Sequence, residues 1–505
     1  MSSSASTAAL AQRYDAIAYA AIAHPLTHPD HLATIGSIFG YAPALPSSCR
    51  VLEVGCNDGS NLIPMAAVLP GSTFVGCDLS ERSITAGRAT VAALGLSNVS
   101  LLVQDLATLD PALGPFDYVI AHGVYSWVPQ PVREALFALV QKTLAPDGLF
   151  FVSFNTLPGC RVRQAAWEML HQHVDGIADP VARMNAARTF ARLVADGSHS
   201  QHAGDDAIRA ELRAIAERPD SQLFHDDLAI PNDPFYFRDV VAHAQRCGLA
   251  YLAETEIHSM SGAGITPAAR QFLSSLDATA REQYLDFMRL RRFRQSILHR
   301  AGTQPVAAPF APERLEAMHV AADPSLQRAA QAGKLGDLAR ELDPGPGAAA
   351  VRAWLEAMVA QAPGSVPVRQ AREWIARGGG GIARGGGGAK PADALLREAY
   401  VSALVTLHAV PPPLVTSVSA RPLASAVARH QAARQEMVTN LRHVGVRVAE
   451  APTRYLLTLL DGTRDRPGLV RAMTERWSPA PGGPDAAASV DRTLAEFARL
   501  GLLSA

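Results

Sequence analysis

The stretch VLEVGCNDGSNL, from Val51 to Leu62, brings a carboxylate, two glycines and an asparagine into one short loop. The apolar run CRVLEVG is strand-like and NLIPMAAVL has helical spacing, so the loop lies at a strand-to-helix turn. Backbone N–H groups and a helix N-terminus can approach a ligand at such a turn. These residue types predict a cofactor-binding loop, and their spacing has to decide which cofactor it holds.

A dinucleotide fingerprint requires glycines at positions 55, 57 and 60, where this chain has Gly55, Asn57 and Ser60. The central glycine is replaced and the glycine that packs the helix is missing, so the dinucleotide register fails. A different pattern, acidic-x-Gly-x-x-x-Gly, fits Glu53, Gly55 and Gly59. Asn57 then occupies a position where asparagine tolerates a positive φ better than other non-glycine residues do.

Polar residues also follow the next predicted strands. STFVGCDLS ends in Asp78, near the spacing at which a carboxylate binds ribose hydroxyls. LLVQDLATL places Asp105 at the end of a third strand, and LAPDGLFFVSFNT supplies a fifth. Between them, FDYVIAHGVYSWVP supplies a fourth strand and a loop that carries His122, Tyr125 and Trp127. The apolar residues of these strands are ordinary core residues, but polar residues at four successive strand ends predict a ligand site at one edge of the sheet.

The composition places these elements in a large chain of 505 residues and 53.5 kDa, which predicts about three structural units. A formal net charge of -1 gives no overall field that would attract nucleic acid or an anionic membrane. The five cysteines form no CxxC pair, and we find neither a leader sequence nor a run of about 18 apolar residues. We therefore expect a reduced, cytoplasmic protein with no membrane segment and no nucleic-acid partner.

Several strings resemble one known family, the class I S-adenosylmethionine (AdoMet) methyltransferases that carry a methyltransferase regulatory domain. Characterised members of that family include bacterial protein lysine methyltransferases that modify outer-membrane proteins. The acidic-x-Gly-x-x-x-Gly loop resembles motif I of these enzymes, and the resemblance extends from about Tyr14 to Leu502. The other matching strings are YDAIAY, THPDHLATIGSIFG, GVYSWVP, SFNTLPG, DPFYF, RRFRQSILHR and LLDGTRDRPGL.

The resemblance implies AdoMet as cofactor, an α/β fold with a Rossmann-like seven-stranded sheet, dimers, and a C-terminal domain lying over the catalytic domain. A carboxylate such as Glu53 is compatible with a sulfonium cation, which has no pyrophosphate to neutralise. The predicted cofactor site comprises Glu53, Gly55, Asn57 and Gly59 in motif I, Asp78 and Leu79 at the ribose, Asp105 and Leu106 at the adenine, and His122 facing the methyl donor.

The acceptor side of the predicted site is aromatic. Tyr125 and Trp127 are the candidates for a wall that holds a cationic reactant by cation–π contacts, with Phe154 and Asn155 behind them. The predicted catalytic residues are thus Tyr125, Trp127 and Asn155. One departure concerns the position after SFNTLPG, where many relatives have tryptophan and this chain has Cys160. If that aromatic ring walls the substrate cavity, the acceptor specificity here differs.

The downstream sequence predicts insertions and two further domains. We expect a catalytic domain over 1–303, with helical insertions at about 161–222 and 262–290 that serve regulation or dimerisation. PFYFRDVVAHAQRCGLAYLAETEI supplies the sixth helix and strand, and FRQSILHR supplies the last strand. The other predicted units are a helical middle domain (304–377), a Gly-rich linker (378–392) and a C-terminal winged-helix-like domain (393–505).

Three other features have plainer interpretations. NDPFYF, starting at Asn232, is similar to an acceptor-binding motif of amine methyltransferases, but that motif belongs after the fourth strand, so a helix start is favoured. The arginines of 289–294 predict a solvated helix end. His24, His28 and His31 have helix-like spacing that Pro25 and Pro29 interrupt, so we expect no metal there. Thr27 or Asp30 is instead the expected cap of a helix that runs through Phe39.

Three functions stay open at this point. The leading hypothesis is methyl transfer from AdoMet to protein lysine side chains by in-line displacement. A second is methylation of a nitrogen or oxygen in a small molecule or peptide, favoured by Cys160 and by the absence of a basic patch. A third is a non-catalytic AdoMet-binding scaffold, possible because cofactor binding alone does not establish turnover.

Overall fold

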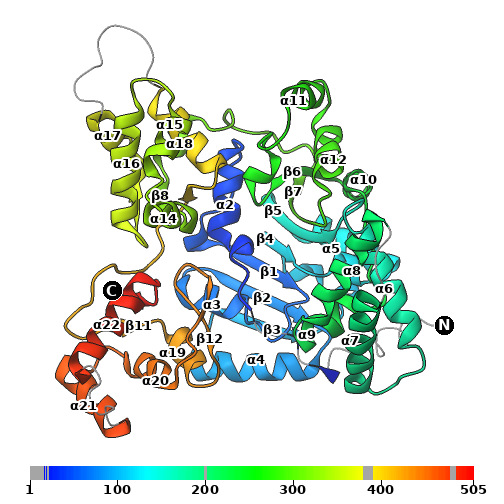
Figure 1. Cartoon of the computed structure of the whole chain (residues 1–505), viewed down its shortest axis with the longest axis horizontal. Helices are drawn as coiled ribbons and strands as arrows, with labels where there is room; N and C mark the ends of the chain where they lie inside the picture. The colour runs from blue at the N-terminus through cyan, green and yellow to red at the C-terminus, as the bar shows by residue number, and fades with distance from the viewer. Residues whose placement is uncertain are drawn as a thin grey trace.

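The computed structural model describes residues 16, 17, 19, 22–197, 202–378, 390–477 and 485–504. Its centre is a seven-stranded sheet with the order β3-β2-β1-β4-β5-β7-β6 (Figure 1). Strands β1 to β5 pair in parallel, whereas β7 runs antiparallel to both β5 and β6. The predicted class I methyltransferase sheet is confirmed. Its strands are β1 Arg50–Val54, β2 Thr73–Asp78, β3 Val99–Val103, β4 Phe116–Ala121, β5 Leu144–Asn155, β6 Leu249–Glu254 and β7 Phe293–Arg300.

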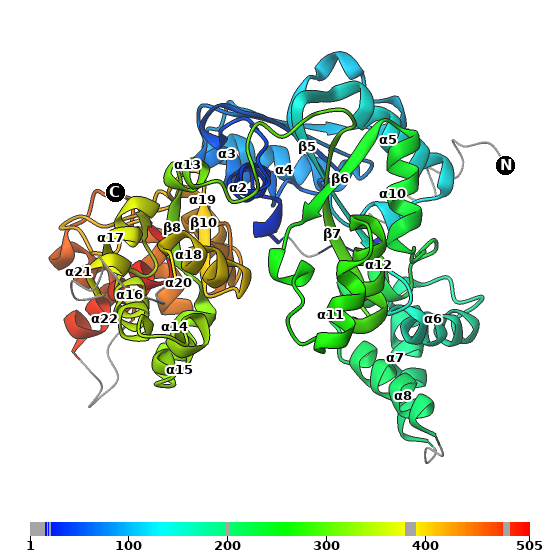
Figure 2. The same ribbon diagram turned by 90° about the horizontal axis from the view of Figure 1, so that it is seen from above.

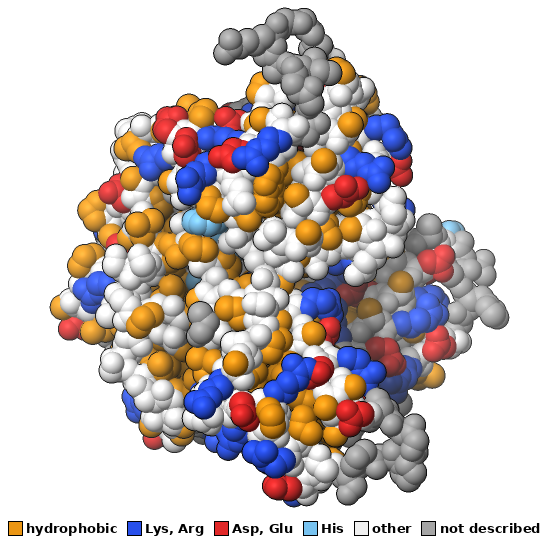
Figure 3. All heavy atoms as spheres, turned by 90° about the vertical axis from the view of Figure 1, so that its left-hand side faces the viewer, with side chains coloured by type: hydrophobic (Ala, Val, Ile, Leu, Met, Phe, Trp, Pro, Cys, Tyr) orange, Lys and Arg blue, Asp and Glu red, His pale blue; other side chains and the backbone are white. Residues whose placement is uncertain are grey.

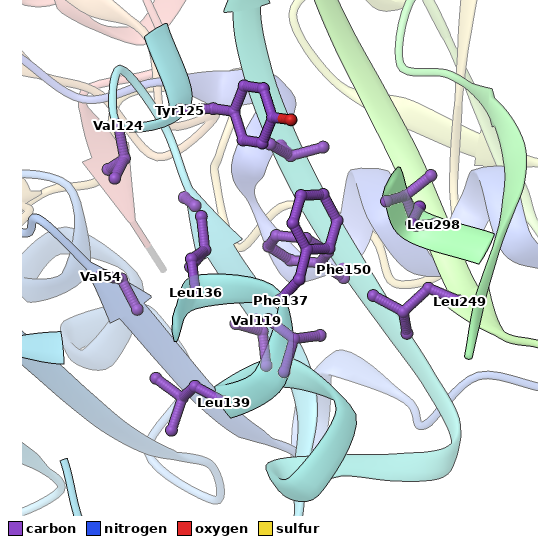
Figure 4. Packing of buried hydrophobic residues seen from close by; sticks show 14 of the residues in the cluster. Val54, Val119, Val124, Tyr125, Leu136, Phe137, Leu139, Phe150, Leu249 and Leu298 are labelled. Carbon is purple, nitrogen blue, oxygen red and sulfur yellow. The ribbon is translucent and has the colours of Figure 1, made fainter. Parts of the chain in front are cut away.

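The side chains of each strand alternate between the two faces of the sheet, and both faces are buried because a core packs against each of them. On β4, Val119 and Ala121 join a core that contains Phe137 of α5, whereas Tyr118 and Ile120 join a core on the opposite face. Figure 4 shows Phe137 beside Val119 and Phe150. The helices of these layers are α2 Pro29–Ile38, α3 Leu62–Val68, α4 Glu81–Leu94, α5 Gln130–Thr143 and α10 Phe237–Arg246.

Helix α2 begins differently from our expectation. Its cap is His28, whose Nδ1 accepts a hydrogen bond from the backbone N–H of Asp30 at 3.1 Å, and not Thr27 or Asp30. The predicted break at Pro25 and Pro29 is confirmed, because Pro25 opens a short 3₁₀ turn and Pro29 opens α2. The sequence could not reveal this cap because histidine is an uncommon capping residue.

Residues 161–227 form a helical layer beside the sheet. It consists of α6 Arg161–His173, α7 Pro180–Asp196, α8 Ala203–Ala216, the short α9 Asp220–Gln222 and a π-helical turn, η6 Leu223–Asp227. These helices share a core of their own, which includes Trp167 and Leu170. Figure 2 shows α6, α7 and α8 extending away from the sheet on the side where α11 (Pro267–Ser274) and α12 (Ala278–Arg289) lie.

The middle segment is not purely helical, which corrects our expectation. Strand β8 lies between β10 and β9 in a three-stranded antiparallel sheet, packed against α16. Helix α18 and β10 belong to the same core, so the predicted start of the C-terminal unit at residue 393 falls inside this one. Most of the predicted Gly-rich linker lies outside the described residues. The elements are α13 Pro312–Glu316, β8 His319–Ala322, α14 Pro324–Gln331, α15 Leu335–Leu342, α16 Ala348–Gln361, β9 Ser365–Pro367, α17 Val368–Gly378, α18 Ala392–Val401 and β10 Val405–His408.

The C-terminal segment has its own core, formed by helices around two pairs of short strands. Helix α19 contacts α3 and α4 of the catalytic domain, so this unit lies beside motif I (Figure 1). On the face in Figure 3, acidic side chains lie among the basic ones. The elements are β11 Leu423–Ala424, α19 Ala426–Ala432, β12 Met437–Thr439, β13 Gly445–Arg447, α20 Ala451–Leu459, α21 Arg466–Arg476, α22 Ala486–Arg499 and β14 Leu503–Ser504. Within the described ranges, none of the helices combines the length and apolar character that crossing a bilayer requires.

Candidate functional site

A cavity of about 340 Å³ opens at the carboxyl ends of β1 to β5. This edge includes the point where the strand order reverses between β1 and β4, and ligands of open α/β sheets bind at such a point. Most of the predicted site residues line the cavity: Glu53, Gly55, Asn57, Asp78, Leu79, Asp105, Leu106, His122, Trp127 and Asn155. Gly59 and Tyr125 do not.

The loop after β1 is held tightly against the end of β2. The backbone N–H groups of Gly55 and Cys56 donate to the carbonyl oxygen of Cys77, at 2.8 and 3.1 Å. Gly55 has φ +72°, and a Cβ there would lie 3.0 Å from a methyl group of Val124. Asn57 has φ +52°, in the left-handed region as predicted, and its N–H donates to the carboxylate of Asp78 at 2.8 Å. The loop therefore turns its backbone toward the cavity.

Glu53 is a buried carboxyl with spare hydrogen-bonding capacity. Asn61 Nδ2 donates to its Oε1 at 2.8 Å, whereas Oε2 is buried and has no partner among the described residues. Burial raises the pKa of Glu53 to about 8, although the bond from Asn61 opposes this shift. A buried acceptor without a partner is costly, so this oxygen is suited to a donor brought by a ligand, in particular a cationic one.

Asp78 and Asp105 lie side by side because β2 and β3 are neighbours in the sheet. Asp78 accepts from the N–H groups of Asn57 and Ser80, at 2.8 and 2.9 Å. Asp105 accepts from the N–H of Ala107 at 2.9 Å. A carboxylate has about four lone-pair sites, so both groups are fixed by the backbone and can still accept hydrogen bonds from hydroxyl or amino groups of a ligand.

Two histidines that line the cavity are in contact with each other. The ring centroids of His24 and His122 lie 3.9 Å apart, and His122 Nδ1 lies 3.3 Å from Ser153 Oγ. Burial lowers the pKa of His24 to about 4 and that of His122 to about 3. Both imidazoles are therefore neutral near pH 7 and add no positive charge that would repel a cationic ligand.

The structure corrects our interpretation of Tyr125. Its ring packs edge-to-face against Phe137 and Phe154 in the core, as Figure 4 shows for Phe137, and its hydroxyl lies 2.9 Å from His243 Nδ1. Tyr125 and Trp127 sit on the same 3₁₀ turn but face different ways. Only Trp127 reaches the cavity, and its buried Nε1–H has no partner among the described residues.

Two other predicted residues have structural roles. Gly59 has φ +73°, and a Cβ there would lie 3.0 Å from Leu101, so this glycine serves the turn and its packing. Cys160 is fully buried, and its thiol donates to the carbonyl oxygen of Arg292 at 3.0 Å. Cys160 is not a lining residue of the cavity, so the condition under which it would affect acceptor specificity is not met by this side chain.

The NDPFYF segment lies closer to the site than its sequence position indicated. Asn155 Nδ2 donates to Asn232 Oδ1 at 2.8 Å, and the N–H of Asp233 donates to the carbonyl oxygen of Ser126 at 2.8 Å. The segment therefore packs against both the end of β5 and the loop after β4. We had interpreted NDPFYF as a helix start because it does not directly follow the fourth strand. The helical layer lies between β5 and this segment in the sequence, but the fold brings the segment back to the site.

The sequence did not reveal the far side of the cavity. This side is formed by Tyr19 near the N-terminus, Arg163 of α6, His225 and Asp226 of the π-helical turn, and Phe293 at the start of β7. The position of Asn61, which holds Glu53, was also missed. Tyr19 and His24 show that the N-terminal segment also contributes to the wall of the cavity.

Comparisons with known proteins agree with this architecture. Residues 52–150 match the family model of a methyltransferase domain, 219–300 that of the predicted methyltransferase regulatory domain, and 420–480 that of the PKMT C-terminal winged helix domain. The chain is 31% identical over 234 residues to RP028 of Rickettsia prowazekii, which covers 46% of this chain and 94% of that protein. The chain belongs to the class I methyltransferases with a methyltransferase regulatory domain.

Other relatives of this methyltransferase are longer or more distant. It is 35% identical over 288 residues to RP789 of Rickettsia prowazekii, an alignment that covers 56% of this chain and only 52% of that protein. The solved structure of PKMT2 from Rickettsia typhi in complex with AdoHcy superposes with a TM-score of 0.80 at 24% identity, covering 96% of this chain and 99% of that one. The two chains therefore share a fold over nearly their whole length, and the predicted winged-helix domain is confirmed.

The cofactor of this family is S-adenosyl-L-methionine (AdoMet), and the cavity fits it. The orphaned oxygen of Glu53 suits the α-ammonium group of its methionine part. Asp78 and Asp105, at neighbouring strand ends, suit the ribose hydroxyls and the adenine amino group. The neutral rings of His24 and His122 can accommodate the sulfonium.

Proposed function

We propose that this methyltransferase transfers methyl groups to lysine side chains of proteins. The observation that carries the proposal is the match of residues 420–480 to the winged-helix domain of PKMT, where the abbreviation denotes protein lysine methyltransferase. In this chain that domain lies directly beside the cofactor loop, since α19 contacts α3 and α4. This chain has both the accessory domain of PKMT and a complete cofactor cavity, which supports the same class of acceptor as in PKMT. The core fold alone would not support it, because one fold hosts many functions.

The residues have separable roles in this proposal. AdoMet supplies an electrophilic methyl group and leaves as the neutral thioether S-adenosylhomocysteine (AdoHcy). Glu53, Asp78 and Asp105 would hold and orient the cofactor, and Trp127 and Asn155 of the same cavity would face the acceptor. A lysine that enters there is partly desolvated, which lowers its pKa and favours the neutral amine needed for attack. The face of Trp127 is available to a cationic acceptor by a cation–π contact.

Transfer of label from methyl-labelled AdoMet tests the proposal. The full-length enzyme is incubated with unfolded outer-membrane protein fragments, and the products are hydrolysed and analysed for methylated lysine. Asp78→Ala, which lacks a cofactor contact, is the negative control. Label in methyl-lysine supports the proposal. Label in a base-labile ester, or only in a small-molecule acceptor, would contradict a lysine acceptor and favour methylation of a small molecule or a peptide oxygen. Binding of AdoHcy without transfer to any acceptor would favour the non-catalytic scaffold.

We also propose a cytoplasmic location and a homodimer. All five cysteines are free thiols, as expected in a reducing compartment. Three aromatic rings contact one another edge-to-face in a row and are each more than a third exposed, which favours a protein contact here: Phe272 of α11, and Tyr284 and Phe287 of α12. Light scattering across a concentration series, with Phe287→Ser beside the wild type, measures the assembly state. A monomer at all concentrations would contradict the dimer.

A further inference from the structure

We infer that Asp226 is the acceptor-binding carboxylate, which holds the ε-ammonium group of the substrate lysine and takes its proton before methyl transfer. This inference rests on the proposed lysine acceptor. It adds a residue and a step that the cofactor geometry alone does not supply.

Asp226 is separated from the cofactor carboxylates. Among the described residues that line the cavity, the acidic ones are Glu53, Asp78, Asp105 and Asp226. The first three lie at the carboxyl ends of strands β1 to β3, whereas Asp226 comes from the π-helical turn of the helical layer. A cavity suited to a cationic cofactor at its strand ends thus has a second anionic group on the wall that the helical layer forms. That position suits a second cation, the acceptor.

The neighbouring acid, Asp227, shows why only one of the two is available. Asp227 is fully buried and accepts hydrogen bonds from Arg163 at 3.1 Å, from Trp167 Nε1 at 2.9 Å, and from Arg218. Asp226 makes no ion pair with any described arginine or lysine, and its side chain accepts a hydrogen bond from Tyr19. Consecutive residues of a helical turn point in different directions, so Asp227 anchors the turn while Asp226 faces the cavity. π-Helical turns are frequent at functional sites.

The end of β5 fixes the turn that carries Asp226. Asn155 Nδ2 donates to Asn232 Oδ1 at 2.8 Å, and Asn232 Nδ2 donates to the carbonyl oxygen of Asp226. Asn155 also lines the cavity. The strand that borders the cofactor site and the turn that borders the acceptor site are therefore linked through side-chain amides, which preserves the distance between the two walls.

The charges around Asp226 suit proton transfer. Burial and the nearby carboxylate of Asp227 raise the pKa of Asp226 to about 6, while Arg163, Arg218 and the Tyr19 hydroxyl oppose the shift. Glu211 forms ion pairs with Arg163, Arg218 and Arg292, so those cations are already matched. A carboxylate that is still ionised at pH 7, but more basic than usual, can bind an ammonium and accept its proton.

The step is balanced. One proton moves from the lysine ammonium to the Asp226 carboxylate, which leaves a neutral amine and a neutral carboxylic acid. The lone pair of the amine forms the new N–C bond, and the S–C bond of the donor breaks with its electron pair staying on sulfur. The product is a methylated ammonium, and the proton on Asp226 returns to solvent.

Ligand affinities test Asp226 without any substrate. Sinefungin, an AdoMet analogue with an amine in place of the methyl sulfonium, carries a cation toward the acceptor side, whereas AdoHcy does not. Isothermal titration of full-length Asp226→Asn should show sinefungin affinity about tenfold weaker than in the wild type, with AdoHcy affinity changed by less than about twofold. Asp239→Asn, on the exposed side of α10, is the matched control and should bind both ligands normally. Equal changes for the two ligands would overturn the inference.

Turnover provides the second readout. With a lysine substrate, Asp226→Asn should lose about a hundredfold in kcat/KM, and its residual rate should increase more steeply with pH because solvent must remove the proton. Asp226→Glu, which keeps the carboxylate, should recover part of the loss. Lysine methylation that is unaffected in Asp226→Asn would overturn the role of Asp226 and leave the proposed function intact. Selective loss of sinefungin binding in a protein that methylates no lysine would instead contradict the proposed function and retain Asp226 as a cation site.

Discussion

His443 and Asn61 are 382 residues apart in the chain, yet His443 Nε2 lies 2.8 Å from Asn61 Oδ1. Asn61 also donates to Glu53 at 2.8 Å, so the turn between β12 and β13 of the winged-helix domain is one residue away from the motif I carboxylate. The amide oxygen of Asn61 accepts, so the histidine donates through Nε2–H. The accessory domain thereby contributes directly to the arrangement of the cofactor site.

Removal of this contact should weaken cofactor binding. His443 has φ +59°, so His443→Asn keeps a residue that tolerates this backbone and is too short to reach Asn61. We expect AdoHcy affinity to decrease by about three- to tenfold, equivalent to about 1 kcal/mol for one lost hydrogen bond. Isothermal titration of the variant measures this, with His258→Asn as an exposed control. An unchanged affinity would show that the winged-helix domain does not act on Glu53 through this contact.

Asp78, the proposed ribose-binding carboxylate, has a matched control at the opposite end of the sheet. Asp78 accepts backbone hydrogen bonds at the carboxyl end of β2, and Asp117 accepts one from the N–H of Arg50 at the other end, at 2.8 Å. Asp78→Ala should weaken AdoHcy binding by at least about tenfold, because a cofactor contact and the anchor of Asn57 are both lost. Asp117→Ala should lower thermal stability slightly and leave the affinity unchanged. Similar affinities for the two variants would exclude Asp78 from the site.

The sequence predicted what depends on single strands. Glu53, Asp78 and Asp105 were found because the carboxyl ends of parallel strands meet at one edge, whatever the rest of the chain does. It did not predict Asp226, because that residue faces the cavity only through the packing of the helical layer. Within the loop after β4, the sequence pattern could not show which of Tyr125 and Trp127 faces the cavity. One side of a short 3₁₀ turn faces the core and the other faces the cavity, and tertiary packing alone determines which.

Glu53 should make both stability and cofactor affinity depend on pH. Its pKa is about 8 in the folded protein and about 4.5 when exposed, so the folded state binds the proton more tightly. This contribution to stability is present below about pH 4.5 and is lost as the pH increases toward about 8, at no more than about 1.4 kcal/mol per pH unit. Glu53→Gln should therefore become progressively more stable than the wild type between pH 5 and 8, by urea denaturation.

The affinity for AdoHcy should respond in the opposite direction, because the α-ammonium of the ligand pairs with the ionised form of Glu53. Wild-type affinity should increase from pH 6 to 8, whereas Glu53→Gln should bind about tenfold more weakly at pH 8 and lack this increase. Parallel pH profiles of the two proteins would place the ligand ammonium elsewhere in the cavity.

Acid should destabilise the protein through its buried histidines. Burial lowers the pKa values of His24, His28 and His122 to about 4, 4 and 3, so the unfolded chain binds protons that the folded chain excludes. Their contribution to stability is complete above about pH 6.5 and is lost as the pH falls toward about 4, by up to about 1.4 kcal/mol per pH unit for each histidine.

His122→Phe, which keeps an aromatic ring beside His24, should reduce the number of protons taken up on unfolding at pH 5 by about one. Urea denaturation at pH 5 and 7 measures this number, with the exposed His258→Phe as the control variant. If His122→Phe and the wild type take up the same number of protons on unfolding, His122 is protonated in the folded protein. It would then place a positive charge in the cofactor cavity.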